Sequence, residues 1–380
     1  MSWDIAGMAA IASIGESPAE IFRSLTASRT GIAPLRAFEA ERYRTRHAYE
    51  IDDRGGAGER PFRASEWLRT VVAAALADAG LADPGERYPV LVGTTLRELR
   101  SAELWWTQGR AEPGGLDADR LDFTRALRDT GRAAEVHTVA CACAASLYAL
   151  AMATDLIDLG LADTVVVAGA DSITESAFGV IDRVQTATPD AVRPFDSTHR
   201  GMIMGEGAAA VVLCRRRRGY SGRALLRGVG VNCDARHATA PDGASIRAVI
   251  ADAHKRAGVH PAEIDLVMMH GTGTRHNDAV EASALADVFG AVAAPPVMTA
   301  IKSMTGHTLG GSGLLSLIMA TLAMRHGLVP PIRGLTDPIP EAEGLNLARD
   351  RVRTRPEVAQ IHAFGFGGIN AVAVIEKGIR

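Results

Sequence analysis

The chain has 380 residues, a formal net charge of −3 and a hydrophobic content of 47%. This length allows two or three domains, and the nearly balanced charge argues against bulk binding to nucleic acid or to a membrane surface. Four cysteines do not make a disulfide framework. No apolar run reaches the roughly 18 residues of a membrane span, and the N-terminus lacks the basic flank of a secretory signal. We therefore expect a cytoplasmic protein that binds neither nucleic acid nor a membrane.

The first part of the chain alternates predicted strands with predicted helices. Ser17 and Pro18 are typical of a helix start, and the charged, glycine-punctuated segment 35–60 is typical of a surface excursion. Strands are predicted over 6–15, 88–95, 135–141, 163–171 and 206–214, helices over 17–28, 65–81 and 144–160, and surface helices within 95–131.

The same order of elements recurs after about residue 224. Strands are predicted over 224–234, 265–274, 296–303 and 370–377, and helices over 244–258, 277–290 and 310–327. The strands are continuous apolar runs, which is typical of a sheet that helices cover on both faces. The sequence therefore predicts an α/β fold made of two copies of one topology.

Two cysteines, Cys141 and Cys143, lie where a predicted strand meets a predicted helix. A CxC pair without further ligands nearby is a weak zinc signal, and we expect Cys141 to pack as a small buried side chain. Cys143 occupies the turn itself, where the first N–H groups of the helix favour a thiolate. This segment alone leaves open whether Cys143 packs or acts as a nucleophile.

Four further segments place reactive or glycine-rich groups at predicted strand ends. His270 opens the loop HGTGT, His307 follows Lys302 in IKSMTGH, RPFD precedes GEGA at 193–208, and FGFGG occupies 364–368. A lone histidine at a strand end is usually just packed, and any one of these segments is weak. Together they place one cysteine and two histidines on strand-end loops, where open α/β sheets build active sites.

In this order and spacing, the motifs resemble those of the β-ketoacyl synthase (ketosynthase) family, the condensing enzymes of the thiolase fold. The resemblance covers nearly the whole chain and is weakest over 35–130. It implies a layered α-β-α-β-α architecture with two similar βαβαβαββ-type halves. The first half, 1–223, would carry the nucleophilic cysteine, and the second, 224–380, the two catalytic histidines. The motifs that carry it are ACAAS around Cys143, RPFD…GEGA at 193–208, HGTGT…ND…E at 270–281, IKSMTGH…GG at 301–311 and FGFGG.NA at 364–371.

The resemblance implies a role for each matching residue. Cys143 would carry the growing acyl chain as a thioester, while His270 and His307 would support decarboxylation of a malonyl thioester and stabilise the enolate. Lys302 and Glu281 match a pair that orients the second histidine. Backbone N–H groups of Cys143 and Phe366 would form the oxyanion hole, and contacts to the phosphopantetheine arm would come from Thr272, Thr274, Phe364 and Phe366.

The resemblance also implies partners. We expect no metal and no bound cofactor, because the substrates are carried on the phosphopantetheine of an acyl carrier protein. Carrier proteins are acidic and dock on basic patches. Arg60, Arg63 and Arg69 are candidates for that patch, and the run Arg215–Arg218 is another. We expect a homodimer or a heterodimer with a paralogous ketosynthase-like subunit.

The implied reaction is the decarboxylative Claisen condensation of malonyl-carrier protein with an enzyme-bound acyl thioester, in a fatty-acid-like or polyketide (secondary-metabolite) pathway. One alternative is an acyltransferase that passes the acyl group from Cys143 to a nucleophile without decarboxylation. Another is a non-elongating partner subunit, although such subunits lack the nucleophile. Two departures from the family pattern are histidines: His362 stands where the family usually has asparagine, and His199 where it usually has arginine.

Overall fold

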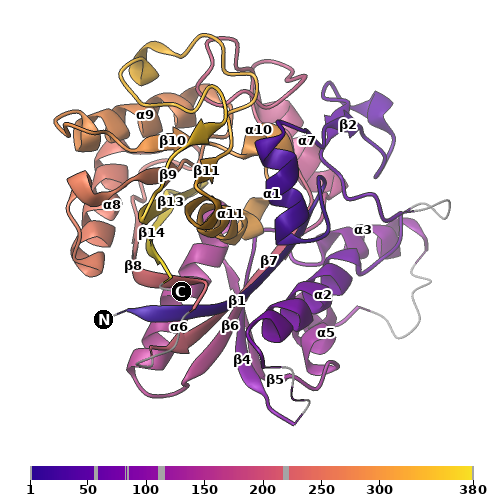
Figure 1. Cartoon of the computed structure of the whole chain (residues 1–380). Helices are drawn as coiled ribbons and strands as arrows, with labels where there is room; N and C mark the ends of the chain where they lie inside the picture. The colour runs from indigo at the N-terminus through magenta and orange to yellow at the C-terminus, as the bar shows by residue number, and fades with distance from the viewer. Residues whose placement is uncertain are drawn as a thin grey trace.

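The structure is a computed structural model that describes residues 2–54, 59–81, 83, 85–109, 116–216 and 222–378. Within these ranges one continuous sheet has the strand order β10-β9-β13-β14-β8-β1-β7-β6-β4-β5 (Figure 1). The strands of the N-terminal half are β1 (Trp3–Ala12), β4 (Tyr88–Thr94), β5 (Ala133–Ala140), β6 (Thr164–Asp171) and β7 (Gly207–Arg215). Those of the C-terminal half are β8 (Ala224–Cys233), β9 (Leu266–Met268), β10 (Val297–Thr299), β13 (Val358–Gly365) and β14 (Ile369–Lys377).

The two halves repeat one topology in the described part of the chain. From the middle of the sheet outward, each half places its first strand, then its fifth, fourth, second and third. The fifth strand is antiparallel to both neighbours, and the outer strands are parallel in both halves. A short antiparallel pairing of β1 with β8 joins the halves. The predicted repetition is confirmed, while the domain boundary at 223/224 stays a prediction that falls between β7 and β8.

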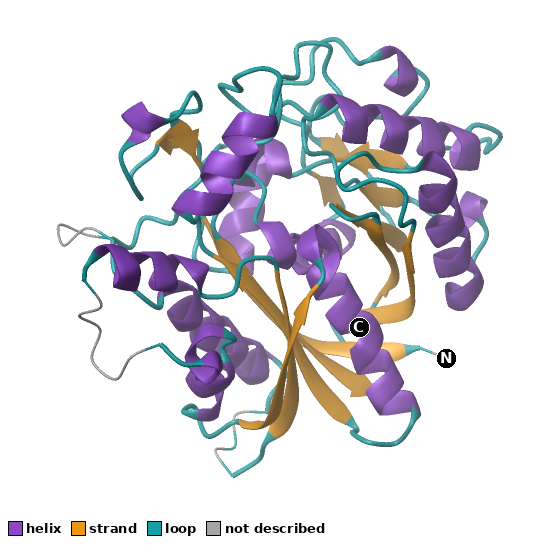
Figure 2. Cartoon of the chain, turned by 180° about the vertical axis from the view of Figure 1, so that it is seen from behind, coloured by secondary structure: helices purple, strands orange, loops and turns teal. Residues whose placement is uncertain are grey.

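Helices form three layers around and between the two halves of the sheet (Figure 2). The inner layer contains α6 (Ala145–Asp158) and α11 (Ser312–His326), and α11 is buried from Ser312 to Met324. The outer layers contain α2 (Arg63–Asp78) on the N-terminal half and α8 (Gly243–Ala257) with α9 (Arg275–Phe289) on the C-terminal half. Three hydrophobic cores fill the spaces between these layers, which gives the α-β-α-β-α architecture.

Shorter elements complete the fold at the surface and at the joints. The remaining helices are α1 (Pro18–Thr26), α3 (Leu99–Thr107), α4 (Ala118–Leu121), α5 (Thr124–Arg128), α7 (Glu175–Val184) and α10 (Lys302–Thr305). Two small sheets pair β2 (Ala33–Pro34) with β3 (His47–Ala48) and β11 (Leu328–Val329) with β12 (Val352–Arg353). Among the helices of the described ranges, none has both the length and the apolar character needed to cross a bilayer.

Three expectations differ from this fold. The strands predicted over 265–274 and 296–303 are shorter, since β9 and β10 have three residues each and Lys302 lies in α10. Strand β13 was not expected, because its buried face carries the polar side chains of Gln360 and His362 and its end was assigned to a loop. Residues 35–60 are also more than a surface excursion, since Tyr49 and Glu50 are buried. Tyr49 packs with Val192 and Ile203, and Glu50 forms an ion pair with Arg54.

Candidate active site

Cys143 lies in a tight turn between β5 and α6. One turn of 3-10 helix, Ala142–Ala144, connects the two elements, and Ala142 has a φ of +46°. The end of β13 approaches this turn so closely that a Cβ on Gly365 would lie 3.0 Å from the Ala142 Cβ. The backbone N–H groups of Cys143 and Phe366 both point at the thiol. The resemblance assigns an oxyanion hole to these two groups, and that role stays a prediction.

The thiol of Cys143 is not activated in the resting protein. Burial raises its pKa to about 11, and the Asp171 carboxylate raises the pKa further, while Lys302 and the two backbone N–H groups lower it. The N–H groups at the helix start do favour a thiolate, but the loss of hydration outweighs them. Cys141, expected to be buried, is only half-buried.

His270 lies in the loop between β9 and α9 and is 1% exposed. Its backbone N–H donates to Glu281 Oε1 over 2.7 Å. Lys302 Nζ donates to the His270 carbonyl oxygen over 2.5 Å and lies 3.4 Å from Nδ1. Burial lowers the pKa of Lys302 to about 8, so the lysine still carries its charge at pH 7. Nδ1 of His270 then accepts, and Nε2 holds the ring hydrogen.

His307 follows α10 and presents the second imidazole. Its Nδ1 accepts the Leu309 N–H over 3.2 Å, so a neutral ring carries its hydrogen on Nε2. That Nε2 is buried and has no hydrogen-bond partner among the described residues. Burial, followed by the charge of Lys302, lowers the pKa of both His270 and His307 well below the usual range. Both rings are therefore neutral donors at pH 7.

These three segments meet at one point between the halves. The Cys143 Sγ and the nearest ring nitrogens of His270 and His307 all lie within 4.8 Å of one another. The two rings stand nearly perpendicular, with their centroids 5.3 Å apart. A thiol beside two imidazole donors and two backbone N–H groups can hold an acyl group and stabilise negative charge on oxygen. Three such ligand atoms could also share a metal ion, which an experiment below addresses.

The predicted arm-binding residues lie in two segments, Thr272 and Thr274 after His270 and Phe364 and Phe366 around the end of β13. Thr272 and Thr274 share a hydrogen bond of 2.8 Å between their hydroxyls. Phe364 is buried, and its ring lies 5.8 Å from that of His270, whereas Phe366 is 46% exposed. Their proposed contact with a phosphopantetheine arm stays a prediction.

Lys302 and Glu281 both act on His270, the first of the two histidines in the chain. Lys302 contacts the His270 ring and carbonyl group, and Glu281 accepts its backbone N–H. The Glu281 charge also raises the pKa of Lys302. The hydrogen bonds of this predicted pair thus converge on the β9–α9 loop, although the resemblance assigned the pair to the second histidine.

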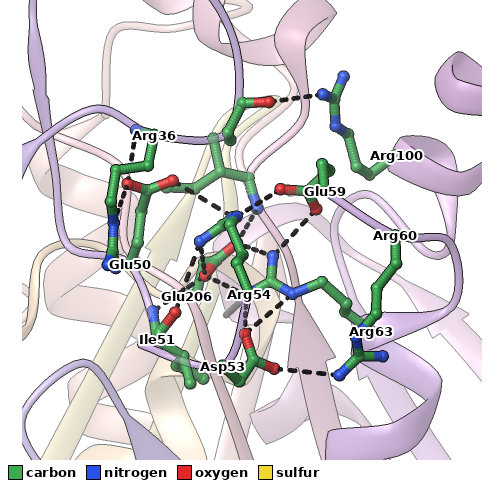
Figure 3. Close-up of polar contacts among 12 residues, drawn as sticks. Arg36, Glu50, Ile51, Asp53, Arg54, Glu59, Arg60, Arg63, Arg100 and Glu206 are labelled. Carbon is green, nitrogen blue, oxygen red and sulfur yellow. Dashed lines mark hydrogen bonds and ion pairs between the residues drawn. The ribbon is translucent and has the colours of Figure 1, made fainter. Parts of the chain in front are cut away.

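Arg63 cannot dock a carrier protein, so that prediction is wrong. The side chain is 1% exposed and forms ion pairs with Glu206, Glu59 and Asp53 in a buried cluster (Figure 3). Glu206 lies 143 residues away in the sequence, so the pairing was not visible there.

The other docking candidates stay predictions. Arg60 is partly exposed and paired with Glu66, and Arg69 is exposed. In the run Arg215–Arg218, Arg215 pairs with Asp163 over 2.8 Å, and 217–218 lie outside the described residues.

Asp171 is a site residue that sequence reasoning missed. This buried carboxylate at the end of β6 accepts the Thr94 hydroxyl over 2.7 Å and the Gly310 N–H over 2.8 Å. Burial raises its pKa to about 6. Because Thr94 and Gly310 belong to different halves, Asp171 ties the His307 loop to the N-terminal half. The sequence signal for Asp171 was an aspartate at the end of a predicted apolar strand.

Comparison with known proteins identifies the family. The N-terminal domain profile of beta-ketoacyl synthases matches residues 4–218, and the C-terminal domain profile of the same family matches residues 223–336.

Individual relatives agree with these profiles. The chain is 33% identical to the tetracenomycin polyketide synthase ketoacyl synthase alpha subunit of Streptomyces glaucescens, over 98% of this chain and 96% of that protein. It is 31% identical to the oxytetracycline polyketide putative beta-ketoacyl synthase 1 of Streptomyces rimosus, over 98% and 95%. A solved ishigamide ketosynthase/chain length factor superposes with a TM-score of 0.89 at 32% identity, covering 99% of both chains. This chain therefore belongs to the beta-ketoacyl synthase family, with the thiolase fold of its structural neighbours.

Proposed function

We propose that this protein is a condensing enzyme that extends an acyl chain on Cys143 by decarboxylative Claisen condensation with a malonyl thioester. One observation carries the proposal: the Cys143 sulfur and the ring nitrogens of His270 and His307 lie within 4.8 Å of one another. Both imidazoles remain, which favours decarboxylation over simple acyl transfer. The retained nucleophile disfavours a silent partner subunit.

The first step loads the acyl group. The Cys143 sulfur attacks an acyl-carrier thioester, the new C–S bond forms, and the old C–S bond breaks. The thiol proton goes to the departing carrier thiolate, so charge and atoms balance. The oxygen of the tetrahedral intermediate is held by the N–H groups of Cys143 and Phe366, which already face the sulfur.

The second step makes the new C–C bond. The malonyl carboxylate leaves as CO₂, and its bonding electrons form an enolate whose oxygen accepts from Nε2–H of His270 and His307. The enolate carbon attacks the Cys143 thioester, and the sulfur leaves as a thiolate that takes up one proton from water. Neutral rings are the required form, because each must donate a hydrogen to the enolate oxygen.

An acyl carrier protein is the proposed partner, and a polyketide-type pathway is the proposed setting. The relatives from Streptomyces glaucescens and Streptomyces rimosus support this setting, because both are named as polyketide ketoacyl synthases.

A second ketosynthase-like chain, either a copy or a paralogue, is the proposed subunit partner. Strand β5 ends the sheet in the described ranges, and Met152, Leu159 and Leu161 expose apolar side chains on and after the adjacent α6. An open strand edge beside exposed apolar groups is typical of an interface. The similar ishigamide ketosynthase/chain length factor supports a two-subunit assembly.

Intact-protein mass spectrometry tests the reaction. The full chain is mixed with an acyl-carrier thioester, the adduct is mapped, and malonyl-carrier protein is then added while CO₂ and product mass are followed. We expect an acyl mass on Cys143, followed by CO₂ and a product two carbons longer. The same rates with and without a chelator are expected, since no step uses the cysteine–histidine triangle as a metal site.

The other outcomes contradict the proposal in distinct ways. An adduct on Cys143 that moves only to an amine, alcohol or thiol, without CO₂, would identify an acyltransferase. A folded dimer that forms no adduct with any thioester would identify a non-elongating subunit. Loss of the reaction on adding a chelator would point to a bound metal.

A further inference from the structure

Two acidic side chains of α9 accept four backbone N–H groups of the catalytic loop. The N–H groups of His270 and Gly271 donate to the two oxygens of Glu281 over 2.7 and 2.8 Å. The next two N–H groups, of Thr272 and Gly273, donate to Asp278 Oδ1, each over 3.2 Å. Four consecutive backbone donors thus depend on two buried carboxylates one helical turn apart.

Each carboxylate also contacts one of the two histidines that depart from the family pattern. His362 Nδ1 lies 2.8 Å from Glu281 Oε1, and His199 Nδ1 lies 3.3 Å from Asp278 Oδ2. An ionised carboxylate only accepts hydrogen bonds, so each Nδ1 must be the donor. His362 comes from β13 and His199 from the loop after RPFD, so the two contacts are independent of each other.

A buried chain of polar groups fixes the His362 ring in the donating form. The Gln360 amide nitrogen Nε2 lies 2.5 Å from His362 Nε2. The amide oxygen Oε1 of the same side chain lies 2.5 Å from His254 Nε2 on α8. If His254 donates to the Gln360 oxygen, the Gln360 nitrogen must donate to His362 Nε2. The hydrogen of His362 is then left on Nδ1, facing Glu281. Second-layer partners of this kind set ring orientation and tautomer.

We propose that His362 and His199 are positioning residues with separate tasks: His362 holds His270 through Glu281, and His199 holds the threonine part of the loop through Asp278. This inference rests on the proposed function. Neither imidazole is assigned a contact with substrate. The Glu281 side of the loop carries the ring used in decarboxylation, whereas the Asp278 side carries Thr272, which leads to Thr274 at the predicted arm site.

The two tasks predict two different kinetic defects. His362→Phe removes the donor to Glu281 and is expected to lower kcat for CO₂ release from malonyl-carrier protein by about 10- to 100-fold, with KM within about twofold. His199→Phe is expected to raise KM for the carrier substrate by about 10-fold, with kcat within about threefold. The rate of Cys143 acylation by a small pantetheine thioester should change little in His362→Phe.

Asparagine variants provide matched controls. The amide nitrogen of asparagine is as many bonds from Cα as histidine Nδ1, so His362→Asn and His199→Asn keep the donor and lose the ring. Each should recover most of the parameter that its phenylalanine counterpart loses. If a phenylalanine variant does not fold, the carboxylates test the same division. Glu281→Gln should then lower kcat, and Asp278→Asn should raise KM.

The outcomes separate this inference from the proposed function. Equal changes in kcat and KM in both histidine variants, or loss of Cys143 acylation together with CO₂ release in His362→Phe, would overturn the division and indicate a merely structural role. Unchanged kinetics in both variants would overturn it as well. A wild-type protein that forms no adduct or releases no CO₂ would instead contradict the proposed function.

Discussion

The two halves of the molecule share one topology but place different chemistry at matching strand ends. After its third strand, the N-terminal half turns into α6 and presents Cys143. After its own third strand, the C-terminal half turns through α10 into α11 and presents Lys302 and His307. The matching helices α6 and α11 pack against each other in the inner layer.

Neither half contains a complete active site. The N-terminal half supplies the nucleophile, and the C-terminal half supplies the donors that would stabilise an enolate. Two close contacts join them at the site: Gly365 lies against the Cys143 turn, and Asp171 accepts the Gly310 N–H. Substitutions in each half should therefore slow different steps of the reaction. Substitutions where the two halves meet should instead destabilise the fold.

The largest effect is expected from removing the nucleophile. Cys143→Ala should abolish the acyl adduct and lower condensation by about 10³-fold or more, because no other described thiol faces the two imidazoles. Peptide mapping after exposure to an acyl thioester measures this. Cys141→Ala is the control and should keep the adduct. An adduct of normal yield on the Cys143→Ala protein would show that acylation occurs elsewhere.

Removing a donor from the C-terminal half should affect only the later step. His270→Ala and His307→Ala should each lower CO₂ release by about 10²- to 10³-fold, the usual loss for one oxyanion donor. Acylation of Cys143 should stay within a few-fold, because its oxyanion site consists of backbone N–H groups. Single-turnover measurements of both steps provide the comparison. Parallel losses in the two steps would refute a division of labour between the halves.

The pH dependence of acylation should reflect the raised pKa of the buried Cys143 thiol. Because the pKa of Cys143 is raised to about 11, its thiolate fraction rises about tenfold per pH unit between pH 7 and 8. Above the Lys302 pKa of about 8, the lysine loses the charge that favours the thiolate, and the rise should become shallower. Alkylation rates of Cys143, followed by mass spectrometry, test this. A plateau reached below pH 8 would be inconsistent with the raised pKa.

The smallest effect is expected where Gly365 of the C-terminal half lies against the Cys143 turn. A Cβ at Gly365 would lie 3.0 Å from the Ala142 Cβ and 3.1 Å from the Cys143 nitrogen. Gly365→Ala should therefore lower the free energy of unfolding by about 1–3 kcal/mol through overpacking. Denaturant unfolding measures it, with Gly344→Ala as the matched control, since nothing lies within 4 Å of a Cβ there. Equal stability of the two variants would show that the backbone around Gly365 and Cys143 shifts to accept the added methyl group.

Much of the fold and the reactive centre could be predicted from the sequence, because long apolar strands and glycine-rich turns are local signals. Strand β13 was missed because Gln360 and His362 are polar although buried. Their partners, Glu281 and His254, lie far away in the chain. No local pattern shows that such groups will be satisfied in the interior.

The burial of Cys143 and of Arg63 was not visible in the sequence. Burial raises the pKa of the Cys143 thiol, and Arg63 was assigned to the surface although it faces Glu206. Hydration and long-range charge pairing are properties of the folded chain. A local reading of composition cannot supply them, even where the residue types are correctly identified.

The Nε2–H of His307, which no described residue accepts, has a consequence for heat resistance. A buried donor left without an acceptor costs about 1–3 kcal/mol. A bound molecule that places an oxygen there satisfies this donor, and the gain forms part of its binding free energy. At equal concentration, the melting temperature should therefore rise more for a ligand with a carbonyl oxygen at this point than for the same ligand without that oxygen.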